Sequence, residues 1–88
     1  MSFLYNMMHP NKKRLVWRDA KMVISQPGDK KADDPNFMHI FYSVYRGVEE
    51  GTFFWYRSKL SGMPNVAVCS SIEDGVKQAE KDFKERYE

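Results

Sequence analysis

Nucleophilic chemistry in this sequence would need Cys69 or a serine as nucleophile beside His9 or His39 as base. Cys69 is the sole cysteine, and His9 and His39 are the sole histidines. A thiol becomes an effective nucleophile when a base lies beside it and a third group orients that base. Cys69 instead ends the apolar run 66–69, where a free cysteine usually packs as a small hydrophobic side chain. The sequence therefore predicts a protein that is not an enzyme, with no catalytic residue.

One pair of acidic side chains, Asp33 and Asp34, could attract a divalent cation. Hard cations need several oxygen ligands, and no third ligand follows this pair at a matching spacing. The sequence also lacks the glycine-rich loops that hold nucleotide phosphates, and it lacks a CxxC pair. We expect no metal, no cofactor and no small-molecule substrate.

Cations interleaved with aromatic rings form the pattern with the most binding chemistry. Residues 1–31 carry a net charge of +5 and residues 32–88 a net charge of −3, which together give the +2 of the whole chain. Bases can stack on aromatic rings of an open sheet while neighbouring cations hold the phosphates. An RNA- or single-stranded-DNA-binding protein is therefore one candidate function. Its candidate phosphate ligands are Lys12, Lys13, Arg14, Arg18 and Lys21.

Alternating apolar residues predict an antiparallel sheet. Residues 15–25 form either one long bulged strand or two short strands, and residues 26–36, with two prolines and a Pro-Gly pair, form a loop. Residues 37–45 and 52–60 form a hairpin around the turn 46–51, and residues 66–69 form a short last strand. The sequence predicts a meander of three to four strands.

A C-terminal amphipathic helix completes the predicted fold, which is α+β. Ser70 and Glu73 have the spacing of a capping box at its start. Gly75 lowers the helix propensity of the first turn and indicates a close approach to a neighbour. One face of the helix is apolar, and its residues are Ile72, Val76, Ala79, Phe83 and Tyr87.

The chain of 88 residues is short enough for a single domain, 1–88. For residues 1–14 the sequence allows both an ordered segment and a partly disordered tail. A single cysteine, no leader-like N-terminus and no apolar stretch of about 20 residues predict a cytoplasmic protein that does not contact the membrane.

Both faces of the predicted hairpin carry large apolar side chains, and one helix can cover only one of them. The second face therefore suggests a dimer or another protein partner, unless the apolar N-terminal segment folds over it. Aromatic side chains and arginine dominate protein interfaces. The candidate protein-binding residues on the uncovered face are Tyr45, Phe53, Trp55 and Arg57.

The order of these motifs resembles the short accessory proteins of tailed bacteriophages and prophages. The resemblance rests on Leu15-Val16-Trp17, on Tyr42-Ser43-Val44-Tyr45 and on the helix that follows Ser71. Gly75 departs from it, because such helices usually carry alanine there. The resemblance implies a protein of the host cytoplasm that engages or inhibits a host protein. We expect a non-enzymatic binding module, with nucleic-acid binding as the alternative.

Overall fold

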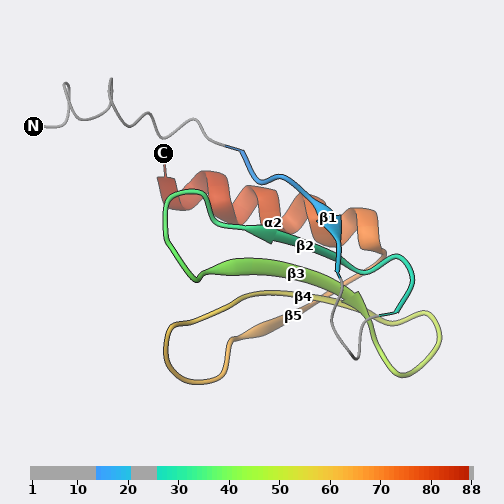
Figure 1. Cartoon of the computed structure of the whole chain (residues 1–88). Helices are drawn as coiled ribbons and strands as arrows, with labels where there is room; N and C mark the ends of the chain where they lie inside the picture. Colours follow the sequence, from blue (N-terminus) through green and yellow to red (C-terminus); the bar gives the residue numbers. More distant parts are fainter. Residues whose placement is uncertain (1–13, 21–25, 88) are drawn as a thin grey trace, which may run out of the picture.

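Antiparallel strands and one helix make up the part of the chain that the computed structural model describes, residues 14–20 and 26–87 (Figure 1). The strands are β1 (Arg18–Asp19), β2 (Lys30–Asp33), β3 (Phe41–Arg46), β4 (Phe53–Arg57) and β5 (Val66–Cys69), and the helix is α2 (Ile72–Tyr87). The strands follow one another in the order β1-β2-β3-β4-β5, and α2 lies along one face of the sheet. The predicted α+β meander with a C-terminal helix is confirmed, with five strands instead of three to four.

The additional strand, β2, lies inside the segment 26–36 that the sequence predicts as a loop. A turn precedes it, in which the Asp29 backbone nitrogen donates to the Gln26 carbonyl at 3.1 Å and Gly28 has a φ of 96°. The Asp29 carboxylate then ties this turn to β3 by accepting the backbone nitrogen of Arg46 at 3.1 Å. Three of the four residues of β2 are charged, so its strand propensity is low. Pairing with β3, rather than propensity, makes this segment a strand.

The next strand begins later than predicted, at Phe41 instead of Phe37. Residues 34–40 form tight turns in which the Phe37 nitrogen donates to the Asp34 carbonyl and the Ile40 nitrogen to the Phe37 carbonyl, at 3.4 and 3.3 Å. His39 has a φ of 68°, a left-handed conformation that non-glycine residues seldom adopt. The apolar alternation of residues 37–40 therefore lies in a turn that precedes the strand.

Little of the first predicted strand, 15–25, is a strand among the described residues. Arg18 and Asp19 pair with Lys31 and Lys30 of β2, respectively. Residues 21–25 lie outside the described residues, and so does the distinction between one bulged strand and two short ones. Most of the predicted N-terminal segment 1–14 lies outside them as well.

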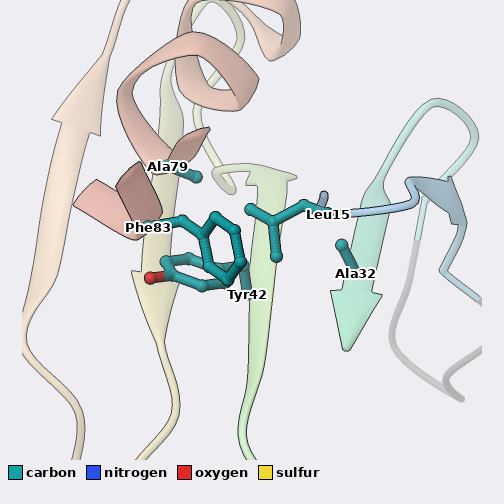
Figure 2. Packing of buried hydrophobic residues seen from close by; sticks show 5 residues of the cluster. All are labelled: Leu15, Ala32, Tyr42, Ala79 and Phe83. Carbon is teal, nitrogen blue, oxygen red and sulfur yellow. The ribbon is translucent and has the colours of Figure 1, made fainter. Parts of the chain in front are cut away.

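The core lies between α2 and the centre of the sheet. Tyr42 on β3 is fully buried, with its ring stacked on Trp55 at 6.2 Å and edge-on to Phe83 of the helix at 6.4 Å. Leu15 and Ala32 close the other side of this cluster, as Figure 2 shows. Fully burying a large side chain contributes about 1.5–3 kcal/mol. These contacts fix which face of the sheet the helix covers.

The N-cap of the helix is Ser71, one residue later than the predicted Ser70. The predicted Ser70–Glu73 capping box is therefore wrong by one position. The Ser71 hydroxyl oxygen accepts the backbone nitrogen of Asp74 at 3.0 Å. The Asp74 carboxylate accepts the Ser70 backbone nitrogen and hydroxyl at 2.8 and 3.0 Å, and these bonds lower the pKa of Asp74. In the sequence Ser-Ser-Ile-Glu-Asp, either serine has an acidic residue three positions later. The helix uses the second serine, Ser71, with Asp74.

At Gly75 the helix lies close against the sheet, as the sequence predicts. A Cβ atom at this position would overlap Val44 Cγ1 and lie 2.9 Å from the Cys69 sulfur. Val44 is fully buried and has no room to move aside. A hydrogen at position 75 is therefore a packing requirement of the contact between α2 and β3.

We expect Gly75→Ala to lower the free energy of unfolding, measured by urea denaturation. Overpacking costs about 1–3 kcal/mol, whereas alanine in place of glycine in an exposed helix would gain about 1 kcal/mol. The sign of the change in the free energy of unfolding therefore distinguishes a close contact from an exposed helix position. A variant more stable than the wild type would contradict the close contact between α2 and β3.

Candidate functional site

The two faces of the sheet differ in what covers them. Cross-strand pairs Val44–Trp55 and Tyr42–Arg57 lie on the face beneath α2, the helix-side face. Side chains on a strand alternate between faces, so their sequence neighbours lie on the opposite face. We call that opposite side the open face, because among the described residues neither a helix nor a second sheet packs against it.

Four aromatic rings form a continuous stripe across β3 and β4 on the open face. They follow one another by ring contact: Phe41 with Tyr56 at 6.0 Å, Tyr56 with Tyr45 at 5.9 Å, and Tyr45 with Phe54 at 5.7 Å. All four rings are half-buried. Burial raises the pKa of the Tyr45 hydroxyl. We call these four residues the aromatic stripe.

Side chains of the neighbouring strands extend the aromatic stripe in two directions. On β2, the Lys31 ammonium lies 4.4 Å from the centroid of the Phe41 ring, a cation–π contact. On β5, Val66 and Val68 are 50% and 72% exposed and lie opposite Tyr56 and Phe54. The open face is therefore aromatic at its centre, aliphatic at the β5 side and cationic at the β2 side.

The four predicted protein-binding residues do not share the open face. Tyr45 belongs to the aromatic stripe, whereas Phe53, Trp55 and Arg57 lie on the helix-side face, so the prediction that they form one uncovered surface is wrong. The reason is the register of the hairpin. Arg46 pairs with Phe53 across the loop 47–52, which places even-numbered residues of β4 opposite odd-numbered residues of β3. The prediction matched odd with odd.

Trp55 and Arg57 instead bind the helix and the β2–β3 loop. The Trp55 indole nitrogen donates to Gln78 at 2.8 Å. Arg57 donates to the Asp34 carboxylate at 3.1 Å, and that carboxylate also accepts the Tyr87 hydroxyl at 2.6 Å. Burial lowers the pKa of the Arg57 guanidinium, but its hydrogen bonds to Asp34 and Tyr87 outweigh this and raise the pKa overall. We call Asp34, Arg57 and Tyr87 the buried polar triad.

The residues proposed to hold phosphates are only partly described. Arg18 is in an ion pair with Asp33 at 3.1 Å, and Arg14 is exposed. Lys12, Lys13 and Lys21 lie outside the described residues. The described part of the chain therefore leaves the predicted basic cluster untested.

Cys69 and His39, the candidate nucleophile and the one candidate base among the described residues, are separated by the length of β3. His39 precedes the start of β3, whereas Cys69 is paired with Phe53 at the level of Arg46, the other end of β3. Cys69 is buried against Gly75, and burial raises the pKa of its thiol. Asp33 and Asp34 are bonded to Arg18 and Arg57, as described above. Within residues 14–20 and 26–87, no three acidic, histidine or cysteine side chains gather as a metal site would require.

Comparison of the sequence with protein-family models, with curated proteins and with solved structures yields no match. Among the described residues, α2 is the helix to consider for a membrane span, and it does not have the length and apolarity to cross a bilayer.

Sequence reasoning missed two elements of the open face. Val66 and Val68 were identified as a strand but not as exposed apolar groups, although their alternation with Ala67 and Cys69 carries that signal. The prediction did not place Phe54 and Tyr56 on the same face as Phe41 and Tyr45, because it did not use the length of the hairpin loop. An even-length loop between two strands fixes the parity of the pairing, so the six residues of the predicted turn 46–51 could have corrected it.

The buried polar triad predicts that Arg57→Met will be strongly destabilising. It would leave the Asp34 carboxylate, which is 0% exposed, without its cation, and breaking a buried pair in this way typically costs about 3–5 kcal/mol. Arg18→Met is the matched control, since its pair with Asp33 is 54% and 61% exposed and should cost at most about 1 kcal/mol. Equal losses in urea denaturation would contradict the structural role of Arg57.

Alkaline pH should destabilise the fold through Tyr42. Burial and the hydrogen bond from its hydroxyl to Asp82, 2.7 Å long, raise the pKa of Tyr42. An unfolded tyrosine loses its proton near pH 10, whereas folded Tyr42 keeps its proton. The stability that protonated Tyr42 contributes is therefore complete below pH 10 and is lost as the pH rises above 10. Urea midpoints between pH 8 and 11 should therefore fall more steeply for the wild type than for Tyr42→Phe. Identical pH slopes would contradict the assignment.

Proposed function

We propose that this chain is a non-enzymatic binding module that engages a protein partner through the open face of its sheet. The observation that carries the proposal is the aromatic stripe, Phe41, Tyr45, Phe54 and Tyr56, on the face opposite the helix. An antiparallel sheet in water usually presents polar side chains on the face that its helices leave uncovered.

The composition of the open face favours a protein as its ligand. Aromatic residues are enriched at the centre of protein interfaces and charged residues are depleted there. The aromatic stripe has this composition, with Lys31 at its edge and the exposed valines of β5 beside it. The matching partner surface is apolar at its centre and carries an acceptor for Lys31 at its rim.

Ring packing within the aromatic stripe argues against base stacking as its principal use. The contacts Phe41–Tyr56 and Tyr45–Tyr56 are edge-to-face, with interplanar angles of 73° and 84°. Stacked bases need accessible flat ring faces, and an edge-to-face contact covers a face of one ring with the edge of the other. Nucleic-acid binding through the basic N-terminal third is therefore the second candidate, which the experiment below distinguishes.

The resemblance to accessory proteins of tailed bacteriophages fits this proposal, since it implies a protein of the host cytoplasm that engages or inhibits a host protein. A protein of that kind acts by occupying a surface and needs neither a cofactor nor a catalytic group.

The proposal is tested by capture on immobilised protein from a lysate of the organism that encodes the chain. Phe54→Lys places a charge in the aromatic stripe. Phe37→Lys is the matched control, because Phe37 is exposed but lies in the β2–β3 loop. We expect a protein that the wild type and Phe37→Lys retain and that Phe54→Lys loses by at least about tenfold, the loss expected where one anchor contributes roughly 1.4 kcal/mol.

Circular dichroism of each variant serves as the control for folding. The same bound proteins on all three baits would contradict the open face as the binding surface. Capture that nuclease abolishes, or that weakens steeply between low and moderate salt, would favour the nucleic-acid alternative, because phosphate contacts depend strongly on salt.

A further inference from the structure

The two edges of the sheet are protected to different degrees. β1 is two residues long and consists of Arg18 and Asp19, so charge and shortness protect this edge. β5, Val66-Ala67-Val68-Cys69, contains no charge, proline or glycine, and its pairing with β4 is continuous, without a bulge. Within the described part of the chain, no strand lies on its outer side. Unprotected edges of this kind pair readily with another strand.

The hydrogen-bond pattern identifies which backbone groups of β5 point outward. The Gly47 nitrogen donates to the Thr52 carbonyl and the Ser58 nitrogen to the Phe41 carbonyl, so even-numbered residues of β4 bond to β3. In an antiparallel sheet, the backbone groups of successive residues form hydrogen bonds with the strands on opposite sides. Phe53 and Trp55 therefore bond to β5, through their partners Cys69 and Ala67. The N–H and C=O groups of Val66 and Val68 are left for the outer edge.

The β5 side of α2 carries the carboxylate of Asp74 near its start and the ion pair of Arg86 with Asp82, 3.0 Å long, near its end. Asp74, near the start of the helix, accepts the backbone nitrogen of Ser70, which follows β5. Gln78 bonds to Trp55, and Asp82 and Arg86 line a cavity of about 430 Å³ together with Ala67 and Lys59. Spacing of four residues places Asp74, Gln78, Asp82 and Arg86 on one side of the helix. We call these four residues the polar ladder.

Three cations line the cavity at the C-terminal end of the polar ladder: Arg57, Lys59 and Arg86. Arg57 is paired with Asp34 at 3.1 Å and Arg86 with Asp82 at 3.0 Å, so Lys59 carries the excess positive charge. Lys59 is exposed and has no ion-pair partner among the described residues, and the Arg57 Nε is buried without a hydrogen-bond partner. A negative group at this end of β5 would be stabilised.

We propose that β5 pairs with β5 of a second copy of this chain, antiparallel about a twofold axis that passes beside Ala67. In this register Val66 and Val68 exchange backbone hydrogen bonds with Val68 and Val66 of the second copy. Ala67 faces its own counterpart, and the small side chain leaves space between the two helices. The exposed valines form two cross-strand pairs on the open face, which stabilise such a ladder.

Charge complementarity supports this second copy over an unrelated strand. The twofold axis makes the two helices antiparallel, so the polar ladders run in opposite directions. Arg86 and the cation-lined cavity then lie beside Asp74 of the second copy, and the reverse pair forms at the other end. The proposal rests on the edge of the sheet and on α2, and it does not require that the open face bind a partner.

Self-association is tested first on the unmodified chain by sedimentation equilibrium. The weight-average mass should rise from 10.4 kDa toward twice that value between about 1 and 100 µM, the range of a small interface. Val66→Pro should keep the chain monomeric, because proline removes an outward N–H and is tolerated at the first residue of a strand. A wild-type chain that stays monomeric throughout this range would overturn the proposal.

Cross-linking tests the register. In a Cys69→Ala background, Ala67→Cys would lie opposite itself in a non-hydrogen-bonded pair with Cα atoms about 4.5 Å apart, within disulfide range. With oxidised glutathione as electron acceptor we expect a covalent dimer. Val48→Cys in the same background is the control, since Val48 is 103% exposed but lies in the β3–β4 loop. Equal cross-linking of both variants, or none in a folded Ala67→Cys protein, would contradict the register.

Charge reversal tests the complementarity of the polar ladders. Arg86→Glu, which also breaks the pair of Arg86 with Asp82 in the same helix, should weaken the dimer about two- to tenfold at low salt. Lys81→Glu, an equal charge change at an exposed position of α2, should have little effect. Equal effects would show that net charge, and not the polar ladder, governs association. Phe54→Lys should leave the Ala67→Cys cross-link in place, so the two proposals can fail separately.

Discussion

The contact of Tyr42 with the helix determines the rest of the architecture. Its ring fills the space between Trp55 and Phe83, and its hydroxyl reaches Asp82 on α2. Because this ring is large and fully buried, the helix must lie over β3 and β4 on that face. Every other large ring of the hairpin is then assigned by alternation, either beneath the helix or on the open face. Burial of one tyrosine thereby determines which face of the sheet the helix leaves uncovered.

The sequence was sufficient for those elements whose signal is local. The apolar stripe of α2, the short strand at residues 66–69 and the close approach at Gly75 each depend on side chains a few residues apart, and the structure confirms them. β2 was missed because Lys30, Lys31 and Asp33 carry no strand signal. Its strand conformation comes from pairing with β3, which the local sequence does not encode.

The candidate site was harder to predict than the fold, because it depends on which strand faces coincide. Tyr45 was placed correctly on the open face, but Trp55 and Arg57 were assigned to it only through an error of one residue in the cross-strand register. Composition pointed to aromatic residues and arginine as the candidate binding groups. It could not distinguish an arginine that meets a partner from one buried against Asp34, because both uses require the same planar cation.

The six-residue connection 47–52 between β3 and β4 has a consequence for how this chain can vary. Inserting or deleting a single residue there would turn β4 over, so that Phe54 and Tyr56 would lie beneath the helix and Trp55 would lie in solvent. A change of two residues would leave both surfaces as they are. Among descendants of this chain, length variation in that connection should therefore come in pairs.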